Sequence, residues 1–195
     1  MKIQRPIGLF VIGCFLLAAG CQTAKPAVGQ TVTVGSADDA VSLAILSERD
    51  VRLKYGRTFT ENPFVAPAPS VFPAYNDYIV LQLNFNTRGK VPLVLQRAEV
   101  TDDRGKQFAT FMTRDKFTDF AMNLSPDQAA NTLRRDKIGW YYLPQTSMTL
   151  EAGTHSYLLV MVGAHPIPDT ATIHVEVTIN GIDRDFDMPV PVSNP

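Results

Sequence analysis

The chain is poor in the residues that build disulfide scaffolds, metal sites and nucleic-acid interfaces. Its 195 residues include two cysteines, three histidines and one tryptophan. Two cysteines are too few for a disulfide scaffold, and the 14 prolines and 12 glycines form no collagen-like repeat. Charge is nearly balanced, with 18 Lys and Arg residues against 19 Asp and Glu residues. This balance argues against nucleic acid as the main partner, because phosphate binding requires a strongly basic surface.

Familiar catalytic motifs are also missing. The sequence contains no Gly-x-Ser-x-Gly elbow, no His-Glu-x-x-His pair and no phosphate-binding glycine loop. Hydrophobic residues make up 45% of the chain and charged residues 19%, which is typical of a folded domain. We therefore expect a folded protein that is not an enzyme and uses no cofactor. A hydrolase whose catalytic residues assemble from distant positions of the chain is a third alternative. It ranks after the interaction role and the ligand-binding role described at the end of this subsection.

The first twenty residues have the pattern of an export signal. Lys2 and Arg5 give a positive start, and Ile7 to Ala19 is an apolar stretch of 13 residues. This stretch is shorter than the about 20 apolar residues that a membrane-spanning helix needs, so it indicates a signal peptide. The small residues Ala18-Ala19-Gly20 then lead into Cys21.

Small residues ending at a cysteine resemble the lipobox of bacterial lipoproteins, although Ala18 stands where that family usually has leucine. In this family the signal is cleaved before the cysteine, which is acylated on its thiol and its new N-terminus. The resemblance implies a signal peptide over 1–20 and lipidation with palmitate-type chains at Cys21. Because Gln22 rather than aspartate follows, it also implies sorting to the outer membrane. An ordinary secreted protein and an N-terminal membrane anchor are the alternatives.

Cleavage before Cys21 changes the charge and leaves a tethered body. Loss of Lys2 and Arg5 leaves 16 basic and 19 acidic residues, a net charge of −3. Such a body gains no electrostatic help at an anionic membrane, but two acyl chains suffice for stable anchoring. Residues 21–35 are polar and small, which predicts a lipidated flexible tether. Residues 36–195 are expected to form one domain, long enough to bury a core of its own.

Apolar runs after residue 40 predict a chain made mostly of strands. Besides 40–55, the expected strands are 78–85, 93–101, 108–112, 140–143, 147–150, 155–162, 173–179 and 182–190. Alternation within 40–55 favours two strands, while a helix from Ser36 to Tyr55 competes with them. The run Ser125-Pro126-Asp127-Gln128 has helix-start order and predicts a short helix to about Arg135.

The clearest local signal is Asn180-Gly181 between two alternating runs. This dipeptide predicts a two-residue hairpin, because a type I′ turn needs positive φ at both positions. The resulting register places Ile179 opposite Ile182, Glu176 opposite Asp185, and His174 opposite Asp187. Short strands without repeats or helix–strand alternation favour a β-sandwich.

Several segments resemble the immunoglobulin-like domains of small bacterial envelope lipoproteins. They are Asn-Asp-Tyr-Ile-Val-Leu-Gln-Leu-Asn-Phe (76–85), Val-Pro-Leu-Val-Leu (91–95), Asp-Asp-Arg-Gly-Lys (102–106) and Leu-Glu-Ala-Gly-Thr-His-Ser-Tyr-Leu-Leu-Val (150–160). The resemblance covers about Asp77 to Val190 and implies a mostly β fold, an immunoglobulin-like antiparallel β-sandwich. A short helical insertion near 114–137 departs from that pattern. Such domains are usually accessory, which implies an interaction role.

The hairpin register yields one candidate metal site, formed by Glu176, Asp183 and Asp185. Carboxylates directly opposite on paired strands have Cβ atoms ~4.5–5.5 Å apart and repel each other. Calcium binds oxygen ligands at about 2.3–2.6 Å and relieves such repulsion. The competing interpretation is a solvated acidic face that protects the strand from aggregation.

A second candidate site is aromatic and basic. Trp140, Tyr141 and Tyr142 are consecutive, and Arg134 and Arg135 precede them. If these rings are exposed, they offer a platform for a sugar or a peptide, and the arginines can bind a carboxylate or a phosphate. If the rings are buried, they are core residues.

The preferred function is a lipid-anchored, non-catalytic interaction module. Its partners are the membrane, through its lipid, and other envelope proteins, with 114–145 as the contact surface. The alternative is a periplasmic or surface protein that binds glycan, peptide or calcium.

Overall fold

The structure, a computed structural model, describes residues 31–34, 39–58, 60–65, 77–123, 127–163 and 167–190. The predicted signal peptide, Cys21 and residues 22–30 of the predicted tether (21–35) lie outside these ranges, whereas residues 31–34 of that tether form a strand that pairs with 41–44. The strands are β1 (Thr31–Val34), β2 (Asp39–Leu46), β3 (Asp77–Thr87), β4 (Val91–Thr101), β5 (Gln107–Phe111), β6 (Ser147–Leu150), β7 (Gly153–Gly163), β8 (Thr172–Ile179) and β9 (Ile182–Pro189). The helices are α1 (Glu48–Tyr55), α2 (Arg114–Asn123) and α3 (Gln128–Tyr141).

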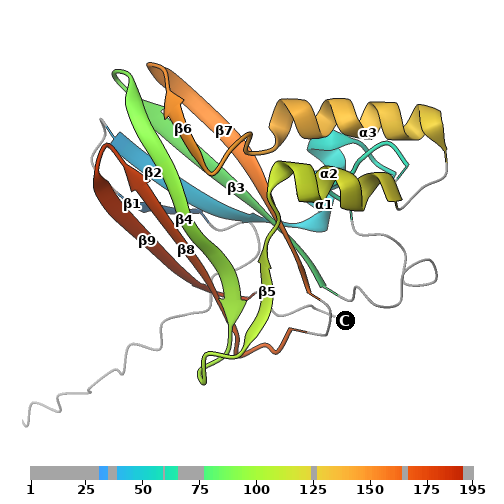
Figure 1. Cartoon of the computed structure of the whole chain (residues 1–195). Helices are drawn as coiled ribbons and strands as arrows, with labels where there is room; N and C mark the ends of the chain where they lie inside the picture. The colour runs from blue at the N-terminus through green and yellow to red at the C-terminus, as the bar shows by residue number, and fades with distance from the viewer. Residues whose placement is uncertain are drawn as a thin grey trace, which may run out of the picture.

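The nine strands of the described residues belong to one antiparallel sheet, which confirms the mostly β prediction. Their order is β1-β2-β3-β7-β5-β4-β8-β9, and β6 pairs with β4 beside this path. The sheet curls until it is nearly closed, while the three helices gather at one side of it (Figure 1). β5 holds the curl together because it pairs with β7 on one side and with β4 on the other.

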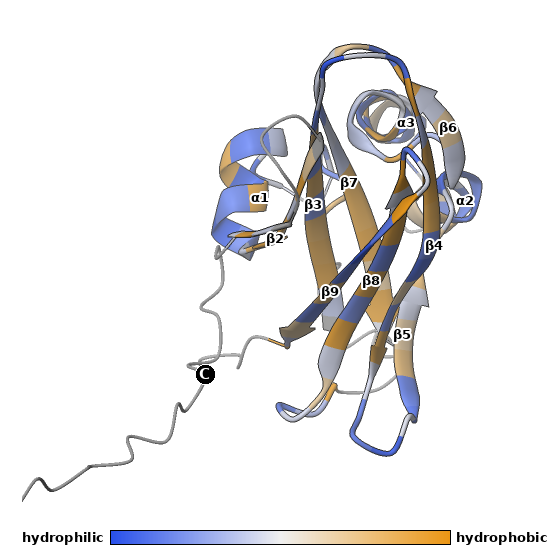
Figure 2. Ribbon diagram, turned by 90° about the vertical axis from the view of Figure 1, so that its left-hand side faces the viewer, coloured by the Kyte–Doolittle hydropathy of each residue, from blue (hydrophilic) through white to orange (hydrophobic). Residues whose placement is uncertain are grey.

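The main core fills the inside of the curled sheet. Alternating residues of β8 point inward, and Figure 2 shows the resulting bands of apolar and polar residues on β8 and β9. The same core takes inward residues from β2, β3, β4 and β7, so both halves of the sheet bury their apolar faces against each other. Sheet alternation of period two explains why the spacing predicted these strands well.

A second apolar layer lies between the helices and the outside of β3 and β7. Leu81 and Leu159 face the main core, whereas Val80 and Val160 face the helix layer. Where the helices cover them, at 79–81 of β3 and 158–161 of β7, these two strands are buried on both faces, which explains the continuous apolar sequence of these two segments (Figure 2). The helical layer adds Phe64, Phe117, Ala121, Ile138 and Tyr142.

The hairpin prediction is confirmed in both turn and register. Asn180 has φ 52° and Gly181 has φ 75°, as a type I′ turn requires. Ile179 is opposite Ile182, Glu176 is opposite Asp185, and His174 is opposite Asp187.

Two element predictions were wrong. Residues 48–55 form helix α1 rather than a strand, because Ser47 caps the helix by accepting from the Asp50 amide at 3.0 Å. Val51 is its one buried residue, so the apparent alternation of residues 51–55 did not mark a sheet face. Residues 140–141, predicted as strand, complete helix α3, which runs past the expected end at Arg135. The predicted helical insertion is present as two helices, α2 and α3.

None of the helices among the described residues is long and apolar enough to cross a membrane.

Candidate functional site

The predicted aromatic and basic site is divided by helix α3 into buried and exposed parts. Trp140 is 69% exposed and Tyr141 is 37% exposed, and Arg135 also faces solvent. Tyr142 and Arg134 are buried at 1% and 0% exposure. The five residues therefore do not form one surface, and the prediction that Tyr142 and Arg134 face a ligand was wrong.

Tyr142 is part of the core beneath α3. Its hydroxyl donates to the Met112 carbonyl at 2.6 Å and accepts from the Val160 amide at 3.2 Å. Its ring stacks on Phe117 with 4.8 Å between centroids. Burial raises the pKa of Tyr142 far above the ordinary value of a phenol. These contacts fasten the end of α3 to β7 through a neutral, fully paired tyrosine.

Arg134 lies inside the same layer, on the side of α3 that faces the sheet. Burial lowers the pKa of its guanidinium, and the neighbouring Tyr78 acts in the opposite direction. Tyr78 itself donates its hydroxyl to the Pro63 carbonyl at 2.7 Å. A fully buried arginine is exceptional, and sequence analysis did not predict it because arginine is usually a surface residue.

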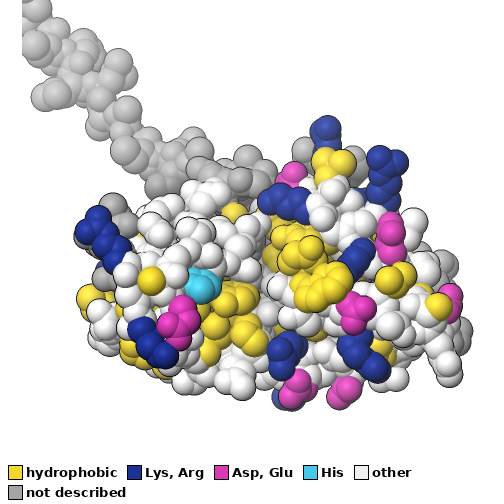
Figure 3. All heavy atoms as spheres, turned by 90° about the horizontal axis from the view of Figure 1, so that it is seen from above, with side chains coloured by type: hydrophobic (Ala, Val, Ile, Leu, Met, Phe, Trp, Pro, Cys, Tyr) yellow, Lys and Arg dark blue, Asp and Glu magenta, His cyan; other side chains and the backbone are white. Residues whose placement is uncertain are grey.

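The exposed remainder is a compact apolar surface on α3, which we call the α3 face: Leu133, Trp140 and Tyr141. Leu133 is 54% exposed and lies two helical turns before Trp140, on the same side of the helix. The rings of Trp140 and Tyr141 meet edge to face, with centroids 6.4 Å apart. Figure 3, which views the molecule from above Figure 1, shows hydrophobic side chains at the surface with Lys and Arg among them. The seven-residue spacing of Leu133 and Trp140 places them on one side of a helix, and sequence analysis did not use this signal.

The α3 face is held against helix α1. Tyr55 of α1 meets Tyr141 edge to face at 4.9 Å between centroids, and Lys137 donates to the Tyr55 carbonyl at 2.5 Å. At its other end, α3 is capped by Asp127, whose carboxylate accepts from the Ala129 amide at 2.9 Å. The contacts with α1 therefore hold the end of α3 that carries the exposed rings.

The predicted calcium residues lie on the outer face of β8 and β9. Glu176 and Asp185 are directly opposite, as expected, but Asp183 is opposite Thr178 and accepts its hydroxyl at 2.6 Å. Within the described parts of the chain, no group of three or more His, Cys, Asp or Glu side chains is placed to hold a metal ion. The structure therefore does not bring the three carboxylates together.

A hydrogen-bonded relay crosses the same face. Thr101 Oγ1 lies 3.0 Å from His174 Nε2, and His174 Nδ1 lies 2.6 Å from Asp187 Oδ1. This is the order of a hydroxyl nucleophile, a base and an orienting carboxylate. A depression of about 350 Å³ is lined by His174 and Asp187, with Arg97, Val175, Glu176 and Asp185. Thr101 does not line it and is only 6% exposed, so the hydroxyl is not offered to a substrate.

Arg97 and Glu99, on strand β4 beside the relay, are paired with each other. Arg97 and Glu99 form an ion pair, and this hydrogen bond is the largest cause that lowers the pKa of Glu99 and raises the pKa of Arg97. Glu99 also accepts from Gln107 at 2.6 Å. On the outer face of β4, β8 and β9, Arg97, Glu99 and Gln107 are thus bonded to one another beside the His174–Asp187 pair.

No family model, no curated protein and no solved structure matches this chain.

Proposed function

We propose that this protein is a lipid-anchored component of the bacterial cell envelope, acylated at Cys21, that acts by contact with other envelope proteins rather than by catalysis. The export pattern over 1–20 and the lipobox-like ending support the anchor. Gln22 supports the outer membrane as its location. The observation that carries the contact role is the α3 face, where the chain's single tryptophan is 69% exposed.

The α3 face has the chemistry of an interaction surface. Tryptophan and tyrosine are the side chains that most often dominate binding energy at protein interfaces. Large apolar side chains that are exposed next to one another indicate a contact site, whereas single apolar residues scattered over the surface do not. Both rings stand on a helical insertion outside the sheet, where sequence can vary without disturbing the main core.

We further propose that the sheet is an immunoglobulin-like β-sandwich whose two halves stay joined through β5. Inward residues of β2, β3 and β7 pack against those of β4, β8 and β9 in one core, as in a sandwich. An experimental structure tests this finer assignment by the order and crossing of the strands.

The contact role is tested by photo-crosslinking in intact cells, followed by purification through a C-terminal tag and mass spectrometry. We expect Trp140→Ala to lose the specific envelope partners that the unaltered chain captures. Ile182→Ala is the matched control, because Ile182 is an apolar hairpin residue that is 47% exposed and remote from the helices in sequence. Equal capture by the Trp140→Ala chain, or capture of nothing but abundant lipoproteins, would contradict the proposal.

A glycan is the second candidate ligand, because an exposed indole beside a tyrosine also stacks on sugar rings. This alternative predicts no stable co-purifying protein. It predicts instead that soluble glycans change the emission of Trp140.

A further inference from the structure

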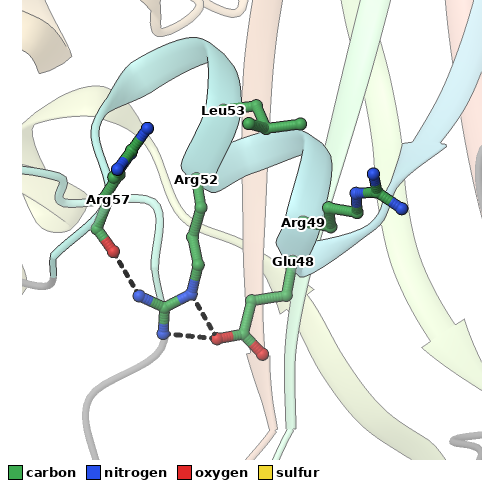
Figure 4. Close-up of a pocket in the computed structure, with 5 residues that line it drawn as sticks. All are labelled: Glu48, Arg49, Arg52, Leu53 and Arg57. Carbon is green, nitrogen blue, oxygen red and sulfur yellow. Dashed lines mark hydrogen bonds and ion pairs between the residues drawn. The ribbon is translucent and has the colours of Figure 1, made fainter.

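Helix α1 carries a second exposed surface, which is basic around an apolar centre. Leu53 is 66% exposed and lines a depression of about 460 Å³ together with Glu48, Arg49, Arg52 and Arg57. We call this set the α1 cup (Figure 4). An isolated surface leucine is ordinary, but here three arginines line the same depression as the leucine.

One of the three arginines is occupied and shapes the cup. Arg52 Nε donates to Glu48 Oε1 at 2.8 Å, and its guanidinium also donates to the Arg57 carbonyl. Figure 4 shows these bonds joining helix α1 to the segment that follows it. The positive charge of Arg52 is thus balanced by the negative charge of Glu48. The bond from Arg52 to the Arg57 carbonyl holds the backbone of Arg57 beside the helix.

The other two arginines are available. Among the described residues, neither the Arg49 nor the Arg57 side chain has a hydrogen-bond or ion-pair partner. They lie on opposite sides of the cup in Figure 4, with Leu53 between them. Cationic groups flanking an exposed apolar side chain suit the headgroup region of a membrane, where the cation meets phosphate and the apolar group enters the interface.

The position of the tether agrees with this chemistry. Strand β1 begins at Thr31, which pairs with Ala44, close to the end of β2 from which α1 starts. Thr31 is ten residues after Cys21, so the extended chain between them measures at most about 35 Å. The segment that leads from Cys21 therefore joins the domain at the end of the sheet from which α1 starts.

We propose that the α1 cup docks on an anionic phospholipid surface and so sets the orientation of the tethered domain, an inference that depends on the lipid anchor proposed above. The net charge of −3 after cleavage does not oppose this contact. Charges farther than the Debye length of about 8 Å are screened at physiological salt, so the local arginines govern it. An acidic protein segment also suits the cup, but the entry point of the tether favours the membrane.

The test places a fluorescent residue in the cup. Trp140→Phe removes the only natural tryptophan, and Leu53→Trp in that background makes the cup the sole emitter. The full acylated chain is reconstituted into vesicles of phosphatidylcholine, with or without phosphatidylglycerol. We expect a shift to shorter wavelength and quenching by brominated lipids in the vesicles that contain phosphatidylglycerol.

Two variants in the same background provide the comparison. Each basic residue near an anionic surface contributes about a fivefold preference for it, so Arg49→Ala with Arg57→Ala should lower the docked-to-undocked ratio about 25-fold. Ile182→Trp in the Trp140→Phe background places the only tryptophan in the β8–β9 hairpin. Its emission should keep the wavelength of a solvated indole and should not be quenched by brominated lipids. All of these substitutions are at exposed positions, and an unchanged melting temperature verifies folding.

Several results would overturn the proposal. They are an unquenched Leu53→Trp on vesicles that carry the chain, equal docking without phosphatidylglycerol, and no effect of the arginine substitutions. A photo-crosslinker at position 53 that captures a protein segment and no lipid in intact cells also overturns it. If mass spectrometry finds no acyl chain on Cys21, the proposed anchor fails instead, and added vesicles still measure the affinity of the cup.

Discussion

Single side chains on α3 and just after it differ sharply in their surroundings, although they are neighbours in sequence. Trp140 is mostly exposed, whereas Tyr142, two positions later, is buried with both hydrogen-bonding roles of its hydroxyl satisfied. Helix α3 ends between them, and the turn of the backbone there sends Tyr142 into the core. Composition alone does not distinguish such neighbours, because aromatic residues serve equally as core and as contact residues.

Tyr142→Phe should destabilise the protein by about 1–3 kcal/mol at neutral pH. The substitution leaves the buried Val160 amide without its acceptor and the Met112 carbonyl without its donor. Urea unfolding measures the loss. Tyr141→Phe is the matched control, because Tyr141 is partly exposed, and it should change the free energy of unfolding by less than about 0.5 kcal/mol.

The same tyrosine predicts a pH dependence. Burial raises the pKa of Tyr142 in the folded state, so the unfolded chain releases this proton first, near the ordinary value of about 10. Stabilisation from the neutral phenol is therefore complete below about pH 10 and is lost as the pH rises above it. Above about pH 10, the difference in unfolding free energy between the unaltered chain and the Tyr142→Phe variant should therefore become smaller. A difference that widens with alkaline pH would contradict the assignment.

Trp140→Ala should leave stability almost unchanged. Because the side chain is 69% exposed, its removal creates no cavity, and the expected change is within about 0.5 kcal/mol. As the only tryptophan, it should also emit at the long wavelength of a solvated indole and be quenched by iodide. A large loss of melting temperature would show that the α3 face is a core surface.

At the scale of elements, local patterns predicted what local forces determine. Period-two alternation and the Asn180-Gly181 turn gave β8 and β9 in the right register, because both signals arise within a few residues. Residues 51–55 were misassigned for the opposite reason. A helix with one buried residue shows no clear apolar stripe, and its start depends on the Ser47 cap.

The hairpin turn should be sensitive to its glycine. Gly181→Ala should cost about 1–2 kcal/mol, because a Cβ is strained at φ 75°. Gly89→Ala is the control: an added Cβ there meets no atom within 4 Å, and its φ is outside the positive range. Chemical unfolding of both variants tests the difference. Equal effects would argue against the type I′ turn.

At the scale of the whole molecule, sequence predicted strands and a helical insertion but not their assembly. Closure through β5 joins residues 107–111 to strands on both sides, which is a long-range pairing without a local signal. The burial of Arg134 and the exposure of Leu133, Trp140 and Tyr141 likewise depend on how α3 lies on the sheet. Residue type was enough to single out the aromatic residues of the candidate site. It was not enough to predict which of its residues are exposed.

The α3 face and the α1 cup belong to one end of this assembly, since Tyr55 and Lys137 connect the two helices. In the proposed arrangement the cup faces lipid and the α3 face is held beside the membrane, where envelope partners are concentrated. The roles proposed for both surfaces depend on the proposed anchor at Cys21.

The most direct measurement is therefore the intact mass of the protein purified from membranes, with the N-terminal peptide sequenced. The account predicts a chain that begins at Cys21 and carries acyl chains on that residue, so that Cys21→Ser abolishes the added mass and releases the protein from the membrane. A chain that begins at Met1, or at any residue other than Cys21, without acylation would contradict it.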